Sequence, residues 1–314
     1  MNETYRNFSI KTVGDGIYAA ISDGGSNAGI VNLGDQTLIF DTFTTVGAAK
    51  ELKTAAERLT GRPPSLVINS HAHGDHYQGN GAFADDAILI SSTKTRNVIA
   101  EEGLLRLERM KNSMMEQAND LRNKSRLMND DNERIQIEAL LKEYDEFFKD
   151  YPQPEDLRLP VLTFDKSLTF RGSERKAKLI TFGGAHSQCD AVLWLPDEGT
   201  LFAADLIIPN DNLILSQGHP ENWLPILGEL EALRPRIIVP GHGGVVPASE
   251  GFQWARYYLN YIHDLVDTIN SSETLVNIDV LKAPSGCRKN WFIQNVRFLL
   301  DLSQKPVSKD SASM

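Results

Sequence analysis

The spacing of apolar and polar residues divides the first ninety residues into short strands and one helix. Short apolar runs alternate with turn-forming stretches such as GDG (14–16) and DGGSN (23–27). A helical pattern begins after Thr44 or Thr45, either of which can cap it, and ends near Gly61. We therefore expect a helix at 45–59 and strands at 8–13, 16–22, 28–33, 36–41, 65–70 and 87–92.

Between residues 94 and 150 the pattern changes to helical spacing. Apolar side chains recur every three or four residues up to Met128 and again from Ile137, with the polar break NDDN (129–132) between them. This pattern predicts two amphipathic helices that form a hairpin, inserted at 94–158. The hairpin is rich in charged residues and methionine, and three roles fit it: a packing layer, a wall over a site, or the interface of a homodimer.

The second half returns to strand spacing and echoes the first. We expect helices at 221–233, 248–271 and 289–303, and strands at 162–170, 176–182, 191–196, 200–205 and 236–240. QTLIFDTFTT (36–45) resembles GTLFAADLII (199–208), and SLVINSHAHGDH (65–76) resembles RIIVPGHGGVV (236–246). We infer an internal duplication with two similar sheets, in one domain spanning 1–305. The polar end, 306–314, is expected to be a flexible tail.

Composition and charge narrow the classes of partner. The net charge is −10, so the chain has no basic excess to pair with nucleic acid or with an anionic membrane surface. The two cysteines are far apart and suggest free thiols rather than a disulfide framework. The first residues lack the pattern of a secretory signal, and no apolar run is long enough to span a bilayer. We expect a cytoplasmic protein with a small-molecule substrate.

The stretch HAHGDH (71–76) places four potential metal ligands within six positions, directly after a predicted strand. In an extended segment, residues two apart face the same way, so His71 and His73 can point at one ion. Asp75 and His76 follow Gly74, where the chain turns, and can point at a second ion. Neutral imidazoles and a carboxylate suit zinc, and also manganese, iron or nickel.

A surface stretch rich in histidine would bind metal without further ligands placed elsewhere. Here three other predicted strands each lead to a ligand-type residue: TFGGAH to His186, LFAAD to Asp205 and IIVPGH to His242. Seven ligand candidates at or beyond strand ends are the arrangement that a two-metal site needs.

These motifs resemble those of the metallo-β-lactamase superfamily: HAHGDH fits its H-x-H-x-D-H signature, and GGAHSQCD, FAAD and VPGHG fit its later motifs in the same order. The resemblance implies an α+β fold, a four-layer αβ/βα sandwich. It also implies that Asp205 bridges two ions, where the most familiar lactam-cleaving members have cysteine. One ion would be bound by His71, His73 and His186, and the other by Asp75, His76 and His242.

The chemistry implied is hydrolysis of an ester, lactone, thioester or amide by a hydroxide shared between two divalent cations, most simply zinc. Asp75 would be both a ligand and the catalytic residue that relays a proton. A β-lactam hydrolase and a phosphodiesterase of the same fold are the enzyme alternatives. The alternative of another class is a metal-free, non-catalytic binding module. That module predicts broken ligand positions, whereas all seven positions are intact.

Other polar residues near these motifs are candidates for supporting roles. His219 and Tyr77 are candidates for contact with substrate, with a solvated loop histidine and a packed aromatic as the alternatives. Cys189 is interpreted as a small buried residue rather than a thiolate ligand. Asp190 and Asp41 are candidates to orient the metal ligands through hydrogen bonds, without binding metal themselves.

Overall fold

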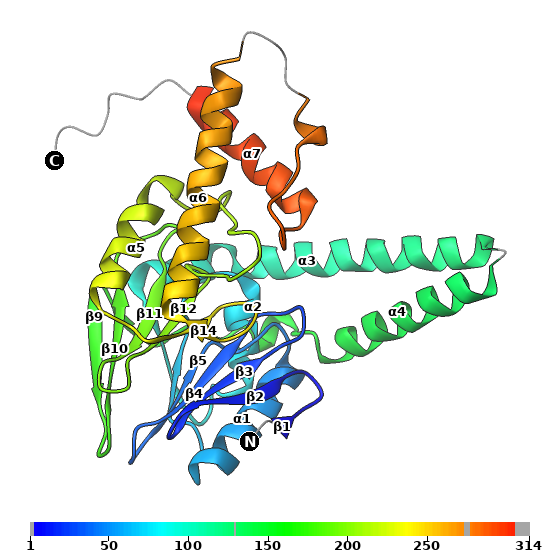
Figure 1. Cartoon of the computed structure of the whole chain (residues 1–314). Helices are drawn as coiled ribbons and strands as arrows, with labels where there is room; N and C mark the ends of the chain where they lie inside the picture. Colours follow the sequence, from blue (N-terminus) through cyan, green and yellow to red (C-terminus); the bar gives the residue numbers. More distant parts are fainter. Residues whose placement is uncertain (1–2, 129, 273–276, 305–314) are drawn as a thin grey trace.

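Two β-sheets packed face to face form the centre of the molecule (Figure 1). The computed structural model describes residues 3–128, 130–272 and 277–304. The eight-stranded sheet runs in chain order through β1 (Glu3–Thr4), β2 (Ser9–Gly14), β3 (Ile17–Ile21), β4 (Ala28–Asn32), β5 (Thr37–Phe40), β6 (Leu66–Ile68), β7 (Ile88–Ser92) and β8 (Leu162–Phe164). The six-stranded sheet, from one edge to the other, contains β14 (Val246–Pro247), β13 (Ile237–Pro240), β12 (Thr200–Ala204), β11 (Ala191–Leu195), β10 (Lys176–Thr181) and β9 (Ser167–Arg171).

The two sheets share a local topology that agrees with the inferred duplication. In the first sheet, β4 and β5 are antiparallel and β5 and β6 are parallel. In the second sheet, β11 and β12 are antiparallel and β12 and β13 are parallel. Asp41 follows β5 and Asp205 follows β12, so the echoed sequence segments occupy equivalent places in the two sheets.

Helices complete the outer layers and the connections. The α-helices are α1 (Val46–Thr60), α2 (Gly74–Tyr77), α3 (Thr93–Leu127), α4 (Asp131–Asp150), α5 (Trp223–Ala232), α6 (Ala248–Asn270) and α7 (Lys289–Gln304). Short 3₁₀ turns cover Gln78–Ala82, Pro154–Asp156, Pro220–Asn222 and Ile278–Val280. None of the helices in the described residues is long and apolar enough to cross a membrane.

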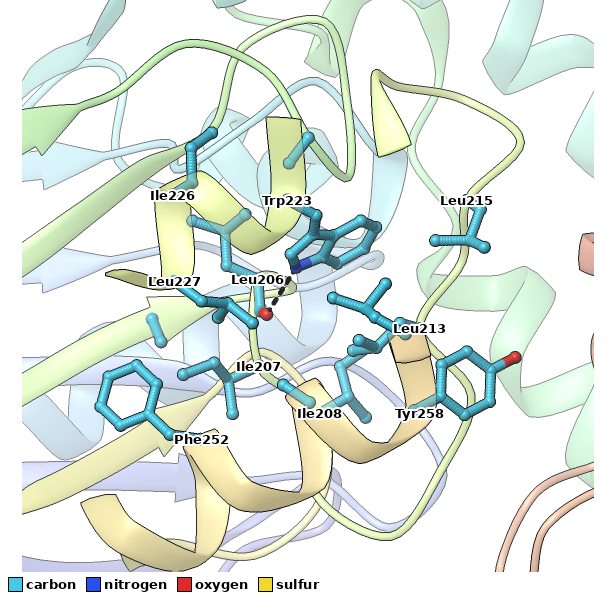
Figure 2. Close-up of a cluster of buried hydrophobic side chains, with 14 of the residues drawn as sticks. Leu206, Ile207, Ile208, Leu213, Leu215, Trp223, Ile226, Leu227, Phe252 and Tyr258 are labelled. Atoms are coloured by element: carbon cyan, nitrogen blue, oxygen red, sulfur yellow. Dashed lines mark hydrogen bonds between the residues drawn. The ribbon is translucent and has the colours of Figure 1, made fainter. Parts of the chain in front are cut away.

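Three apolar cores separate four layers. One core fills the space between the sheets, with Phe40 and Phe202 among its side chains. A second lies between the first sheet and α1, and a third between the second sheet and α5 and α6 (Figure 2). The third core continues into side chains of α7, which packs on α6. The order helix, sheet, sheet, helix confirms the α+β, four-layer αβ/βα sandwich.

Local signals account for the ends of α1. The side chain of Thr45 accepts a hydrogen bond from the backbone N–H of Ala48, which caps the first turn. Gly61 ends the helix in the left-handed conformation, at φ 75°, and its N–H donates to the carbonyl of Glu57. Both residues were expected at these ends from the sequence.

Helices α3 and α4 form the expected hairpin, which extends away from the sheets (Figure 1). Val98 and Ile99 of α3 anchor its base by packing on Ala72 and Tyr77, inside and just after the histidine-rich motif. No side chain of α4 is buried among the described residues. The end of the chain expected to be a flexible tail, 306–314, lies outside the described residues.

Candidate metal centre

Loops and the short helix α2, at one edge of both sheets, bring the seven ligand candidates together. His71, His73, Asp75 and His76 follow β6, and His242 follows β13. A backbone bridge between Ser26 and His242 joins the loops of the two sheets. The side chain of Asn27 strengthens this junction by donating to the carbonyls of Pro240 (3.0 Å) and Gly243 (2.8 Å).

The first cluster contains His71, His73, His186 and Asp205. Nδ1 of His73 lies 3.0 Å from Nε2 of His71 and 2.8 Å from Nε2 of His186. Oδ2 of Asp205 lies 3.2 Å from Nε2 of His186. Ligands held about 2.0–2.1 Å from a tetrahedral zinc ion lie roughly 3.3 Å from one another, so these spacings match a single shared ion.

The second cluster contains Asp75, His76 and His242. Oδ2 of Asp75 lies 3.5 Å from Nε2 of His76 and 3.2 Å from Nε2 of His242. Asp205 also reaches this cluster: its Oδ1 is 3.3 Å from His76 Nε2, and its Oδ2 is 3.4 Å from His242 Nε2. Asp205 therefore stands between the clusters, in the place that a bridging ligand would occupy.

Unpaired buried atoms support the fit of metal ions. Nε2 of His76 and Oδ1 of Asp205 are fully buried and face each other without a hydrogen bond among the described residues. Such atoms are costly unless a partner satisfies them, and a cation between the two would do so. A Cβ atom at Gly241 would collide with this same oxygen, which explains why glycine precedes His242.

Hydrogen bonds behind the rings direct the Nε2 lone pairs into the centre. Nδ1 of His242 faces the carbonyl of Gly25 at 3.0 Å, and Nδ1 of His186 faces that of Ile214 at 3.2 Å. Because a carbonyl can only accept, each Nδ1 carries the hydrogen and each Nε2 is left free to bind metal. These carbonyls could not be predicted from residue types, since every residue carries a backbone carbonyl.

Asp41 performs the same function for two further ligands. Its carboxylate accepts hydrogen bonds from Nδ1 of His76 (2.8 Å) and from the backbone N–H (2.7 Å) and hydroxyl (2.8 Å) of Ser70. The Ser70 hydroxyl in turn accepts from Nδ1 of His71 at 2.9 Å. Asp41 adopts φ 64°, an unusual conformation for a residue with a side chain, so the fold holds this carboxylate under backbone strain.

Changing Asp41 to asparagine is expected to weaken zinc binding about 10–100-fold, because an amide nitrogen in place of Oδ2 cannot accept the Nδ1 hydrogen of His76. Competition with a chromophoric chelator measures this affinity. The matched control is Asp35→Asn, at an exposed turn where the carboxylate accepts only from the N–H of Ser173 among the bonds described. Equal zinc affinity in the Asp41 variant and the control would contradict the orienting role.

Asp190 organises the loop that carries His186. Its carboxylate accepts from the backbone N–H groups of Ala185 (2.7 Å), His186 (2.9 Å) and Ser187 (3.1 Å). The neighbouring Cys189 is not part of either cluster: its sulfur lies 3.2 Å from the hydroxyls of Ser92 and Thr181. Its place agrees with a buried structural thiol.

The structure places the two substrate-contact candidates differently. Tyr77 is 1% exposed and packs beneath α3 against Val98 and Ile99, and its hydroxyl has no hydrogen-bond partner within the described part of the chain. His219 is half-exposed, with Nδ1 3.6 Å from a carboxylate oxygen of Glu221. The loop of His219 does return to the site, because its N–H donates to the carbonyl of Ala185.

Burial and neighbouring charges shift the pKa values of the histidine ligands. Burial lowers the pKa of His73 to about 3. Burial also acts to lower the pKa of His242, but the negative charges of Asp205 and Asp75 outweigh it and raise this pKa to about 10. The pKa of His76 is raised for the same reason. Without a bound cation, the neighbouring carboxylates therefore favour the protonated forms of His76 and His242.

Metal binding is expected to release roughly two protons at pH 7.5, because ligation requires neutral imidazoles. The raised pKa of His242 means that protons compete with metal below about pH 10, so affinity should fall as the pH is lowered through that range. Calorimetric titration with zinc in two buffers of different ionisation enthalpy counts the protons. A binding enthalpy that is independent of the buffer would contradict this expectation.

Comparison with known proteins identifies the family. The model of the metallo-β-lactamase superfamily matches residues 21–91 and 118–242, and the chain belongs to this superfamily. A linear primary-alkylsulfatase from Pseudomonas sp. (strain ATCC 19151) is 23% identical over 240 residues, which cover 72% of this chain and 44% of that protein. The chain thus spans less than half the length of this relative.

Solved structures share the fold at low sequence identity. A metallo-β-lactamase from Pontibacter korlensis has a TM-score of 0.58 and 16% identity, covering 81% of this chain and 99% of that one. The metallo-β-lactamase FIM-1 from Pseudomonas aeruginosa, in its mono-zinc form, has a TM-score of 0.58 and 14% identity, covering 81% and 96%. The expected superfamily membership and fold are therefore confirmed.

Proposed function

We propose that the protein is a dinuclear metal-dependent hydrolase that cleaves an ester, lactone, thioester or amide bond. The observation that carries the proposal is the position of Asp205 between two ligand clusters, within 3.2–3.4 Å of ligand nitrogens in both. Zinc suits the imidazole and carboxylate donors, and manganese, iron and nickel are further candidates. Bound divalent cations would lower the pKa of a water molecule and offset negative charge at the reacting centre.

The ligand side chains differ in their exposure to solvent, which indicates the side from which substrate would approach. The most buried ligands, His71, His76 and His186, are at most 1% exposed, whereas the side chains of Asp75 and His242 are 29% and 28% exposed. Substrate would therefore approach on the side of Asp75 and His242. We assign Asp75, on this exposed side of the site, as the group whose carboxylate takes the proton of the attacking water.

The hairpin supplies part of the surroundings of the site. Phe147 of α4 faces the loop Ser22–Ser26 across a cavity of about 270 Å³. Ser26 at the end of this loop binds the carbonyl of Asp75 and pairs with His242, so the cavity adjoins the exposed side of the site. This position supports a wall role for the hairpin; homodimerisation through the hairpin stays a prediction.

A second candidate reaction is hydrolysis of a primary alkyl sulfate ester. It is favoured by the alkylsulfatase relative, whose similarity covers 72% of the chain. Hydrolysis of a sulfate ester needs the same elements of catalysis: an activated water molecule, and cations that offset negative charge on the sulfate oxygens and on the leaving oxygen.

A substrate panel tests both candidates. Zinc-loaded protein should hydrolyse at least one class among lactones, thioesters, simple esters, lactams and primary alkyl sulfates, with a phosphodiester as a further comparison. Activity should vanish with a chelator and return with zinc. Protein with two bound ions that hydrolyses none of these classes would contradict the proposal.

A further inference from the structure

The carbonyl that orients His186 belongs to a buried loop between β12 and α5. Nδ1 of His186 donates to the carbonyl of Ile214 at 3.2 Å, and the ring packs edge-on against Trp223, with centroids 5.8 Å apart. Figure 2 shows Leu213 and Leu215, the two neighbours of Ile214, in the core beside Trp223 and Tyr258. The direction of the His186 ring thus depends on where this loop holds Ile214.

The side chain of Asn295, in α7, forms hydrogen bonds with the loop on both sides of Ile214. Its Nδ2 donates to the carbonyl of Leu213 at 2.6 Å, and its Oδ1 accepts from the N–H of Leu215 at 3.0 Å. Asn295 is 1% exposed, and Leu213 and Leu215 are fully buried. By binding both, the buried amide fixes the two peptide groups that flank Ile214, one of which carries the carbonyl that faces His186.

Tyr258 links Asn295 and the loop to a second helix, α6. Its hydroxyl accepts from Nδ2 of Asn295 at 2.8 Å and from Nδ2 of Asn212 at 3.2 Å. Asn212 begins the same stretch of loop, and its Oδ1 accepts from the N–H of Arg288. The loop is therefore held by hydrogen bonds from α6, from α7 and from the segment before α7.

We propose that Asn295 is a positioning residue for the metal ligand His186, acting through the backbone from Leu213 to Leu215. The inference rests on the proposed metal-binding function. Helix α7 lies beyond residues 21–91 and 118–242, which match the superfamily, so the family match gives no role to this helix. In this interpretation α7 supports the first metal cluster as well as packing on α6.

The test uses Asn295→Leu, with Asn295→Asp as a nearly isosteric second variant. Leucine removes both hydrogen bonds of this side chain to the loop, while aspartate keeps the acceptor for the N–H of Leu215 and loses the donor to the carbonyl of Leu213. Leu299→Ala is the control. Leu299 is buried in the same helix and core but takes no part in these hydrogen bonds, so its truncation should destabilise the protein and leave the hydrogen bonds in place.

Two measurements separate positioning from general stability. Nitrogen-15 NMR of histidine-labelled protein follows the Nδ1–H of His186, with and without zinc, and competition with a chelator gives zinc affinity. In Asn295→Leu, this N–H should exchange faster with water, and zinc should bind about 10–100-fold more weakly. Asn295→Asp should give smaller changes in the same direction. Leu299→Ala should lower the thermal midpoint and leave both measurements unchanged.

The outcomes distinguish this inference from the proposed function. Asn295 variants that are less stable, but keep the His186 N–H signal and the zinc affinity of wild type, would overturn the positioning role. A wild-type protein that takes up no zinc would instead overturn the metal function. In that case the spectra of the metal-free proteins still show whether Asn295 controls the His186 ring.

Discussion

Replacing Asp205 by alanine is expected to lower hydrolysis by about 10²–10³-fold or more and to reduce the bound metal below two equivalents per chain. Asp205 is 5% exposed and lies within 3.4 Å of a ligand nitrogen in each cluster. Its removal takes a negative charge and a shared ligand from both ions at once. The imidazoles left behind would hold two cations close together with one carboxylate fewer to offset their repulsion.

Elemental analysis and a steady-state assay on the same preparations measure both effects. Asp197→Ala is the control, since Asp197 is an exposed carboxylate that makes a surface ion pair with Lys176. This control should match wild type in metal content and rate. An Asp205→Ala protein with two bound ions and wild-type activity would contradict the bridging role.

Replacing Trp223 by alanine is expected to lower the free energy of unfolding by about 3–5 kcal/mol, the largest effect on stability that we predict for a single residue. Trp223 is fully buried where α5 meets the second sheet (Figure 2), and its Nε1 donates to the carbonyl of Leu206 at 3.0 Å. Alanine would leave a cavity and an unpaired carbonyl. The edge-on contact with the ring of His186 would be lost as well.

Urea unfolding followed by circular dichroism measures this change. Trp291→Ala is the matched control, because this tryptophan is 37% exposed and its ring lies beside the guanidinium of Arg288 at the surface. Its loss should cost about 1 kcal/mol or less. Equal destabilisation by the two substitutions would show that the core beside the metal centre is looser than the structure indicates.

Much of the fold could be predicted because its signals are local. Helical spacing separated α3 from α4 at the break near Asn132, and the cap at Thr45 and the stop at Gly61 defined α1. The two-residue strands β1 and β14 were missed, because they pair at sheet edges and carry no hydrophobic pattern of their own. The short helix α2 was also missed, since its glycine and polar residues resemble a turn.

The candidate metal ligands were predictable because histidines and aspartates with ligand spacing leave a strong trace in the sequence. The residues that orient these ligands through hydrogen bonds were harder to predict. Asp41 could be suspected from its place after a strand, but its hydrogen bonds to Ser70 and His76 depend on the packing of β5 beside β6. Asn295 lies more than one hundred residues after His186, and only the tertiary fold brings α7 to the loop that orients this ligand.

The most direct test of the central claim is the metal content of the wild-type protein. The protein would be stripped with a chelator, reloaded with zinc, freed of excess ion and assayed by elemental analysis against protein concentration. The two ligand clusters joined by Asp205 predict about two zinc ions per chain. A protein that folds normally but retains no zinc would contradict the account.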